Sequence, residues 1–489
     1  MKSDSAIENL VSSEQVDVTA ATDENPSRLS KIIFFLLCAM LVFSNVAFGA
    51  VDVWALGALV FFSGLIALLR FADAGLKKRF GFDTNPLQIV LLALILIGTM
   101  QLLPLRSPAV PDGLLSVPAI ASLSLAPYAT RLAVIQLLVY FVFFSAALFY
   151  INTRNRLRKI SLLIVIFSFL MAFFAILQRF SNAEAIYGLR VPNQANPFGS
   201  YVNGHHFAAF LEMTIGLTLG FVFGRATKNN QRIFFLIAAV VMGMAILFSS
   251  SRGGLLSLLG VVAFVVAANL LPRRRTAREK NSSAETGESN GRGLAFIGGG
   301  LALIVILFGA VLLLGGDDSL LRGIGLENQA DASNGRTHFW QIAWRIFLDY
   351  PIFGAGLDSF GTVFPRYDTW NGRFRVEQAH NDYLQILADA GILGFACVAS
   401  FVFLLFKRGW QIVARETTDE FRRDVCLGAL AGCFGILIHS FFDFPLRTPS
   451  NALFFLTLAV LATASISAPK LAHKKRRRRK LNDRPEENI

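Results

Sequence analysis

Residues 153–179 read TRNRLRKISLLIVIFSFLMAFFAILQR and show the pattern that decides the fold. Four basic residues stand among the first seven, and the eighteen residues that follow, 160–177, carry no charge. An α-helix needs about twenty mostly apolar residues to cross a bilayer. The stretch is therefore predicted to be a membrane-spanning helix that begins on the side where the basic residues lie.

Runs of this kind fill the chain, and each approaches the length of a transmembrane helix once its interfacial ends are included. The sequence therefore predicts an all-α, polytopic integral membrane protein with about 12 transmembrane helices and one large external loop that itself contains helices. The predicted spans are 32–47, 53–69, 87–103, 132–150, 160–177, 207–223, 233–248, 255–271, 294–314, 392–406, 425–441 and 452–466.

The loops between these runs alternate in basic charge. Lys and Arg residues in short loops stay on the cytoplasmic side of a membrane. The loops on one side each hold three or more of them, and those on the other side hold two or fewer, apart from one long loop. This alternation predicts an even number of spans with both termini in the cytoplasm. The basic loops are 70–79, 153–159, 225–232, 272–292 and 407–423.

The same pattern of apolar and polar segments predicts the domain organisation. Residues 1–30 are polar and lack an apolar period, which predicts a disordered cytoplasmic tail. Residues 31–468 form the predicted membrane domain, and 469–489 a basic cytoplasmic tail. The external loop 315–388 is too long for a connector and too apolar for disorder, so we expect it to carry function.

The composition excludes several classes of protein. With 54% hydrophobic and 16% charged residues, the chain is not a soluble domain. The net charge of +13 indicates a role in membrane orientation rather than in nucleic-acid binding, because the basic residues gather in short loops and the carboxyl tail. The four cysteines lack metal-ligand spacing, and no cofactor motif is present, so we expect neither a metal nor a cofactor.

Three arginines on the external side are candidate ligands of a phosphate group. Arg252 follows three serines at the start of a predicted span, where unpaired N–H groups and the positive end of the helix dipole favour an anion. Arg336 opens another predicted helix, and Arg190 lies in an external loop. The alternatives are an interfacial anchor for Arg252 and solvated surface charges for the other two.

The helix that begins near Arg336 is predicted to be amphipathic. Apolar residues recur at positions 339, 342, 343, 346 and 347, and Pro351 ends the pattern. We expect this helix to lie along the outer membrane surface.

His380 is the candidate for acid–base chemistry. It stands in EQAHNDYLQ (377–385), where a polar segment turns into a helix that enters the membrane. An imidazole titrates near neutral pH, which suits a general base. Asn381 and Tyr383, beside it, are secondary candidates, and the alternative is a structural histidine. The adjacent His205 and His206 are predicted to be structural, because helical neighbours point about 100° apart.

The last external turn adds His439, Asp443 and Arg447 as further secondary candidates. Asp443 and Arg447 carry opposite charges four residues apart, so a simple ion pair between them is the alternative to a role in the site.

Several of these motifs occur together, in the same order, in a known protein family. They resemble the O-antigen ligase and polymerase family of bacterial membrane glycosyltransferases, over about residues 190–468. The motifs are Ser251-Arg252-Gly253, Gly335-Arg336 with Trp340, PIFGAG (351–356), His380-Asn381-Asp382-Tyr383-Leu384 with Gly391 and Gly394, and the segment 439–447.

The resemblance implies transfer of a glycan from undecaprenyl diphosphate to an acceptor hydroxyl, in surface polysaccharide (O-antigen) biosynthesis. It implies inversion at the sugar, no metal, and a periplasmic site in the bacterial inner membrane. Arg190, Arg252 and Arg336 would hold the diphosphate, since Arg suits bidentate phosphate contacts better than Lys. His380 would orient or deprotonate the acceptor.

The resemblance leaves the acceptor open. It is lipid A core for a ligase, another lipid-linked repeat for a polymerase, or a protein Ser or Thr for an O-glycosylase, and we favour the ligase. A transporter of a small anion such as bicarbonate is the alternative class. A carrier needs ionisable groups near mid-membrane, and Glu212 is almost the only clear candidate, which favours the enzyme.

Overall fold

The regular structure of the chain is helical throughout the part that is described. Two isolated bridges occur there, but no β-strand. The prediction of an all-α polytopic membrane protein is confirmed. The computed structural model describes residues 27–78, 81–106, 121–181, 185–192, 196–270, 335–370, 375–415 and 419–465, with a few helical residues between 298 and 305.

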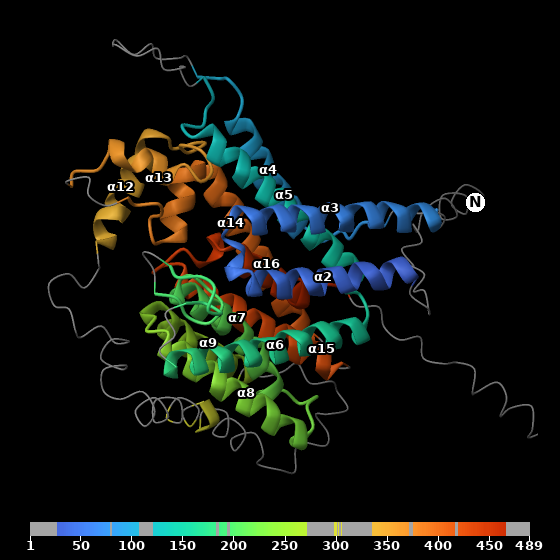
Figure 1. Ribbon diagram of the computed structural model, residues 1–489. Helices are drawn as coiled ribbons and strands as arrows, with labels where there is room; N and C mark the ends of the chain where they lie inside the picture. Colours follow the sequence, from blue (N-terminus) through green and yellow to red (C-terminus); the bar gives the residue numbers. More distant parts are fainter. Residues whose placement is uncertain are drawn as a thin grey trace, which may run out of the picture.

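The helices appear in Figure 1 in chain order from blue to red. They are α2 (Arg28–Val46), η1 (Phe48–Ala50), α3 (Val53–Leu76), α4 (Leu87–Gln101), α5 (Pro127–Tyr150), α6 (Arg154–Phe180), α7 (Gly204–Phe223), α8 (Asn229–Phe248), α9 (Arg252–Leu270), α12 (Arg336–Asp349), α13 (Phe360–Val363), η2 (Phe364–Arg366), α14 (Asp382–Arg415), α15 (Glu420–His439), η3 (Pro445–Arg447) and α16 (Pro449–Thr463).

Eight helices in the described part are long and apolar enough to cross a membrane, and α4 and α16 are shorter apolar helices. Every predicted span overlaps a helix, although for 294–314 only a few helical residues are described. Most of 294–314 lies outside the described residues, as do the linker 272–292 and the carboxyl tail. The predicted tail 1–30 extends too far, because Ser27 already caps α2 by accepting a hydrogen bond from the Ser30 N–H at 3.0 Å.

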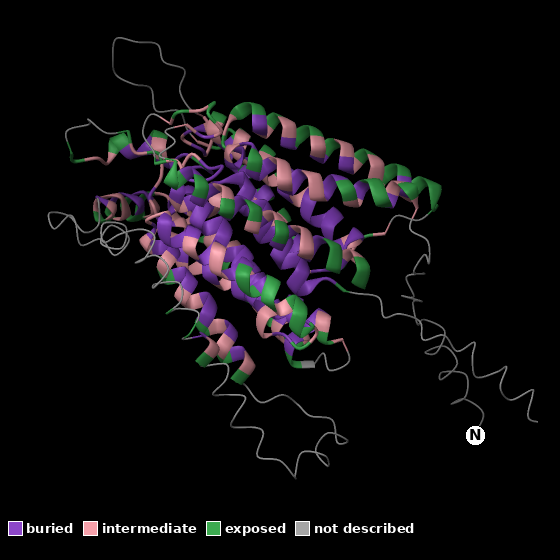
Figure 2. Cartoon of the chain, turned by 60° about the horizontal axis from the view of Figure 1, so that its bottom comes forward, coloured by how far each residue is buried: buried purple, intermediate pink, exposed green. Residues whose placement is uncertain are grey.

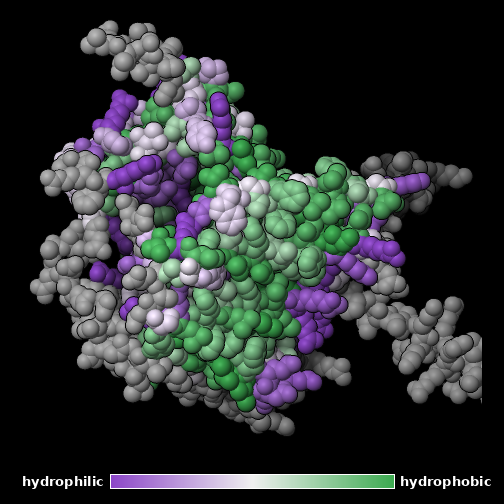
Figure 3. All heavy atoms as spheres, in the orientation of Figure 1, coloured by the Kyte–Doolittle hydropathy of each residue, from purple (hydrophilic) through white to green (hydrophobic). Residues whose placement is uncertain are grey.

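The helices run side by side, with α12 and α13 at one end of the bundle, which we call the α12 end (Figure 1). Buried residues gather in the middle of the bundle (Figure 2). A broad apolar band covers the outer helices, and hydrophilic side chains gather towards the two ends (Figure 3). This distribution fits a bundle that exposes its middle to lipid and both ends to water.

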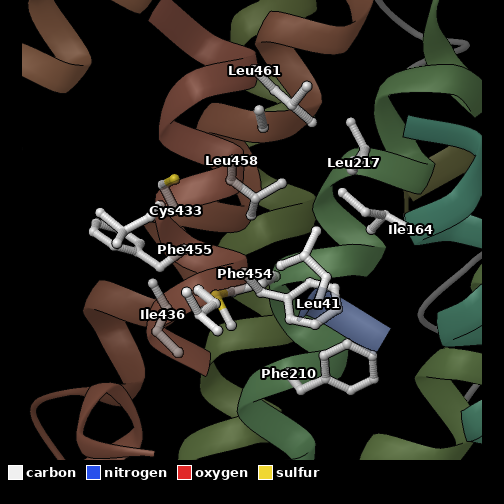
Figure 4. Close-up of a cluster of buried hydrophobic side chains, with 14 of the residues drawn as sticks. Leu41, Ile164, Phe210, Leu217, Cys433, Ile436, Phe454, Phe455, Leu458 and Leu461 are labelled. Atoms are coloured by element: carbon white, nitrogen blue, oxygen red, sulfur yellow. The ribbon is translucent and has the colours of Figure 1, made fainter. Parts of the chain in front are cut away.

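The centre of the bundle is the tight contact of α7 with α15. An ideal Cβ on Gly216 would lie 2.3 Å from the Gly432 backbone nitrogen, and one on Gly220 would lie 2.8 Å from Gly428 Cα. Small residues let helix backbones approach closely in membranes. Large apolar side chains fill the surrounding space (Figure 4). The helix α7 is therefore a fixed support for the side chains at its α12 end.

The helix α12 packs differently from the prediction. Its apolar residues Ile342, Ala343 and Ile346 are buried in a second small core, together with Phe360 and Phe364. The predicted apolar face thus contacts protein rather than the membrane surface. The periodicity predicts the correct face of the helix, but an apolar stripe does not reveal whether lipid or protein covers it.

The run PIFGAG connects α12 to the break in α14. Gly391, inside α14, has φ +64°, and the helix restarts beyond it. The Ile392 N–H donates to Pro351 O at 2.8 Å, and the Ala355 N–H donates to Ala388 O at 2.8 Å. A Cβ on Gly354 would lie 2.3 Å from the Asp389 backbone, so only glycine permits this approach. The first part of α14 is therefore fixed against α12.

Candidate active site

The segment that follows His380 is capped and fastened by its own side chains. The Asn381 Oδ1 accepts hydrogen bonds from the N–H groups of Tyr383 and Leu384, both at 3.0 Å, which starts α14. The Asn381 Nδ2 donates to Phe441 O at 3.1 Å. The Tyr383 hydroxyl donates to Leu437 O at 2.7 Å. The two secondary candidates therefore position the start of α14 against the end of α15.

Asp382 strengthens the same connection. Its N–H donates to Ser440 O at 2.9 Å, and its Oδ2 accepts from the Ser440 hydroxyl at 2.9 Å. The Leu446 N–H also donates to this carboxylate, at 3.4 Å. Consecutive residues of the motif thus bind the turn between α15 and α16, which brings together two segments that are distant in sequence.

His380 completes the set by pairing with Asp443. The His380 Nδ1 lies 3.0 Å from Asp443 Oδ1, and the Phe444 N–H donates to the same oxygen at 2.9 Å. Asp443 is 2% exposed, whereas the His380 side chain is 30% exposed. With Nδ1 facing a carboxylate, we assign its proton to Nδ1, which leaves Nε2 as a proton acceptor. A His–Asp pair with this geometry can act as a general base.

The environment keeps Asp443 ionised. Burial alone would raise the pKa of Asp443, but the hydrogen bond from His380 and the nearby histidines hold it well below its usual range. His380 itself has φ +52°, an uncommon conformation for a residue other than glycine. Such a backbone persists only where the surroundings determine it, and it occurs often at active sites.

His206 is a second histidine close to Asp443. The Thr448 hydroxyl lies 2.7 Å from His206 Nδ1, and His206 Nε2 lies 3.9 Å from Asp443 Oδ1. His206 is buried at the amino end of α7. The prediction that it is structural is compatible with this position, but its contact with Asp443 places it beside the candidate base.

Arg252 is the first residue of α9, at the same end of the bundle. The Ser251 hydroxyl oxygen accepts from the Gly254 N–H at 3.1 Å, which fixes the turn before the helix. A Cβ on Gly253 would lie 3.0 Å from His439 Nε2, so Arg252 stands next to the end of α15. It is half-buried there.

His439 is held by a buried carboxylate. Its Nδ1 lies 3.0 Å from Glu212 Oε2, and both side chains are at most 1% exposed. The pair joins α15 to α7, and it accounts for the one charged residue that the sequence places inside α7. A buried charge of this kind needs its partner, because an unpaired one is strongly destabilising.

Arg336 is the first residue of α12 and is half-buried. Trp340, one turn further along α12, donates from its Nε1 to His380 O at 3.4 Å, which places the start of α12 beside His380. The structure therefore brings Arg252, Arg336 and His380 to the same end of the bundle, as the sequence predicted.

Arg190 is held by an acidic partner, Asp52. Its Nη2 donates to Asp52 Oδ1 at 3.0 Å, its Nη1 donates to the other oxygen, and the guanidinium lies 5.0 Å from the Phe48 ring centroid. These contacts fasten the 185–192 segment to the turn between α2 and α3. To bind a diphosphate, Arg190 would have to exchange its carboxylate for phosphate.

The alternative that Asp443 pairs with Arg447 is wrong. Arg447 instead forms ion pairs with Asp358 and Asp389, while Asp443 pairs with His380. Asp389 is fully buried and also accepts from the Phe360 N–H at 3.1 Å. Sequence reasoning missed Asp389, although a lone acid within the largely apolar stretch 384–398 is a signal that it has a partner.

No group of three or more His, Cys, Asp or Glu side chains suited to a metal ion occurs among the residues with described positions.

The family resemblance is confirmed by comparison with known protein families. Residues 237–399 match the family model described as O-antigen ligase. We call residues 237–399 the O-antigen ligase region, after the family that they resemble. The O-antigen ligase region contains Arg252, Arg336 and His380, whereas Arg190, His439, Asp443 and Arg447 lie outside it. No curated protein matches the chain.

The match supports a function of the O-antigen ligase type in surface polysaccharide synthesis. It indicates an enzyme of the glycosyltransferase kind that acts on lipid-linked glycans in a membrane. The helical bundle described above agrees with this, since several of its helices are long and apolar enough to span a bilayer.

Proposed function

We propose that the chain transfers a glycan from undecaprenyl diphosphate to an acceptor hydroxyl, as a metal-independent, inverting glycosyltransferase. The observation that carries this proposal is the pair of His380 and Asp443, which stands at the same end of the bundle as Arg252 and Arg336. A base and two cations are what this reaction requires, because the donor already has a diphosphate leaving group.

His380 acts on the acceptor. Its Nε2 takes the proton from the acceptor hydroxyl as the oxygen attacks the anomeric carbon of the donor sugar. The new C–O bond forms on the face opposite the departing phosphate oxygen, so the configuration inverts. Asp443 holds the imidazole in the required tautomer and stabilises the positive charge that it gains.

The arginines act on the donor. Negative charge develops on the bridging oxygen as the diphosphate leaves, and guanidinium groups stabilise it with two parallel hydrogen bonds. Arg252 has the additional support of the amino end of α9, whose dipole favours an anion. Arg190 would join them after release from Asp52.

The α12 end is assigned to the periplasmic side, and the enzyme to the bacterial inner membrane. The support is the excess of Lys and Arg in the loops at the opposite end, which keeps that end in the cytoplasm. Undecaprenyl diphosphate carries its glycan on the periplasmic leaflet, where lipid A core is the acceptor for a ligase. We favour this acceptor over a second lipid-linked repeat.

The test uses the purified protein in lipid nanodiscs, with lipid-linked glycan as donor and either lipid A core or a second lipid-linked repeat as acceptor. Transfer to lipid A core supports the ligase, and transfer to the lipid-linked repeat supports the polymerase. Absence of transfer to any acceptor, together with bicarbonate uptake in proteoliposomes, would instead support the anion carrier.

A further inference from the structure

An aromatic side chain lies exposed and rigidly held beside the candidate active site. The Trp370 ring is stacked on the His338 ring, with centroids 4.2 Å apart and planes at 6°, and Trp370 remains 47% exposed. Asp368 fixes both partners: its Oδ1 lies 2.8 Å from His338 Nε2 and accepts from the Trp370 N–H at 3.0 Å. We call these three residues the Trp370 platform.

The local backbone is adapted to this ring. Gly335, with φ +79°, has its Cβ position 2.9 Å from Trp370 Cη2, so any side chain there would displace the indole. The ring thus lies against the residue before Arg336. A large apolar surface in a fixed orientation costs little entropy when a ligand covers it, which is the property of a binding anchor.

The platform is close to the candidate base. The Phe339 ring lies between them, with its centroid 6.0 Å from Trp370 and 6.0 Å from His380. A chain of sugars that has one end at His380 would therefore reach Trp370 within a few units. The C–H groups on the face of a pyranose ring pack well on an indole, and its hydroxyls suit a carboxylate acceptor.

Asp368 has the right charge for that role. The hydrogen bonds from His338 and from the Trp370 backbone hold the pKa of Asp368 below its usual range, so it is a carboxylate at neutral pH. Its oxygens are acceptors for sugar hydroxyls.

We infer that the Trp370 platform is a glycan subsite, at which one pyranose ring of the substrate stacks on Trp370 and is hydrogen-bonded by Asp368. The inference rests on the proposed glycosyltransferase function, and it adds where the sugar chain lies. The ring belongs either to the donor glycan or to the acceptor oligosaccharide, since both share this chemistry.

A membrane anchor is the competing role for an exposed tryptophan, and the chain contains a matched example. Trp344 is also 47% exposed, but it contacts Phe347, at 5.1 Å between centroids, and stands near the exposed Leu348. Apolar neighbours of this kind are typical of the membrane interface. Trp370, by contrast, is stacked on an imidazole held by a carboxylate.

The experiment measures binding of soluble oligosaccharides to the purified, full-length protein by isothermal titration. The probes are the repeat-unit oligosaccharide from the surface polysaccharide of the source bacterium and its core oligosaccharide. Trp370→Ala should bind one of them about tenfold more weakly, which identifies the source of the ring. Trp370→Phe should keep most of the affinity, and Trp344→Ala should bind as the wild type does.

Three results would overturn the inference: binding of both probes by Trp370→Ala at wild-type strength, an equal loss in Trp344→Ala, or no binding by the wild type. Glycan transfer provides a separate readout, in which Trp370→Ala should raise KM about tenfold and leave kcat unchanged. If the wild type binds through Trp370 but transfers nothing, the proposed function fails and the subsite stands. If Trp370→Ala transfers with the wild-type KM, the subsite alone fails.

Discussion

Replacing Asp443 with Asn removes the charge that supports His380, while it keeps the size of the side chain and one hydrogen-bond acceptor. The Asn oxygen can still accept from the Phe444 N–H, which Asp443 now binds at 2.9 Å, so the turn should keep its shape. The His380 Nδ1, 3.0 Å away, would face a neutral amide instead of a carboxylate. We expect kcat to fall while the KM for the donor is unchanged.

The size of the effect follows from the strength of that hydrogen bond. A bond to a charged group contributes about 1.5–3 kcal/mol, and one between neutral groups about 0.5–1.5 kcal/mol. The variant therefore loses about 1–2 kcal/mol of transition-state stabilisation, which corresponds to about 5–30-fold in kcat. Complete removal of the base in His380→Ala should cost more, about 10²–10⁴-fold.

The assay is transfer of labelled glycan from lipid diphosphate under saturating acceptor, with Asp73→Asn as the control. Asp73 is also 2% exposed, and it accepts hydrogen bonds from Ser27 and Tyr150 at the end of the bundle remote from His380. Asp73→Asn should lower the thermal stability without changing kcat. Wild-type kcat in Asp443→Asn, or an equal fall in Asp73→Asn, would refute the role given to Asp443.

Acid stability gives a second readout for the same variant. Because the pKa of Asp443 is lower in the folded state than its ordinary value of 3.8, its contribution to stability is present above that pH and is lost as the pH falls further. Asp443→Asn should therefore unfold with a weaker dependence on pH in the acid range than the wild type.

Further predictions concern the donor site, metal dependence and topology. Arg252→Lys should lose most of its activity although the charge is kept, because an ammonium cannot make the bidentate phosphate contact; full activity in a normally inserted protein would make Arg252 an anchor. Transfer should persist in excess EDTA, and a strict need for added Mg²⁺ or Mn²⁺ would contradict this. A cysteine at the exposed position Thr369 should react with an impermeant reagent outside intact cells, and one at Lys228 should not; the reverse pattern would refute the periplasmic assignment.

The spans were predictable from sequence because crossing a bilayer imposes a simple rule of length and polarity. The runs at 53–69 and 207–223 lie within α3 and α7 for this reason. The position of the amphipathic helix after Arg336 was also predicted correctly. The prediction that its apolar face lies on the membrane surface was wrong, because protein covers that face. An apolar stripe has the same period whether it faces lipid or Phe360.

The sequence predicted which residues lie at the outer end of the bundle, but it did not predict which of them contact one another. His380 and Arg252 were found because polar groups at the outer end of an apolar bundle need an explanation. The partner of Asp443 was not predictable: Arg447 is nearer in sequence, yet His380 is the residue that it contacts. Contacts between distant segments depend on how α14 and α15 pack. This packing cannot be inferred from the spacing of residues in a single sequence.

His380→Ala separates a catalytic histidine from a structural one, when glycan transfer and binding of the lipid diphosphate donor are measured on the same purified protein. Transfer should fall about 10²–10⁴-fold, while folding, membrane insertion and donor affinity stay close to wild type, because the donor contacts belong to the arginines. In cells, long polymer should then remain on its lipid carrier if the protein is a ligase, and single repeats if it is a polymerase. Wild-type transfer by His380→Ala, or loss of folded protein in place of loss of chemistry, would contradict the catalytic role of His380.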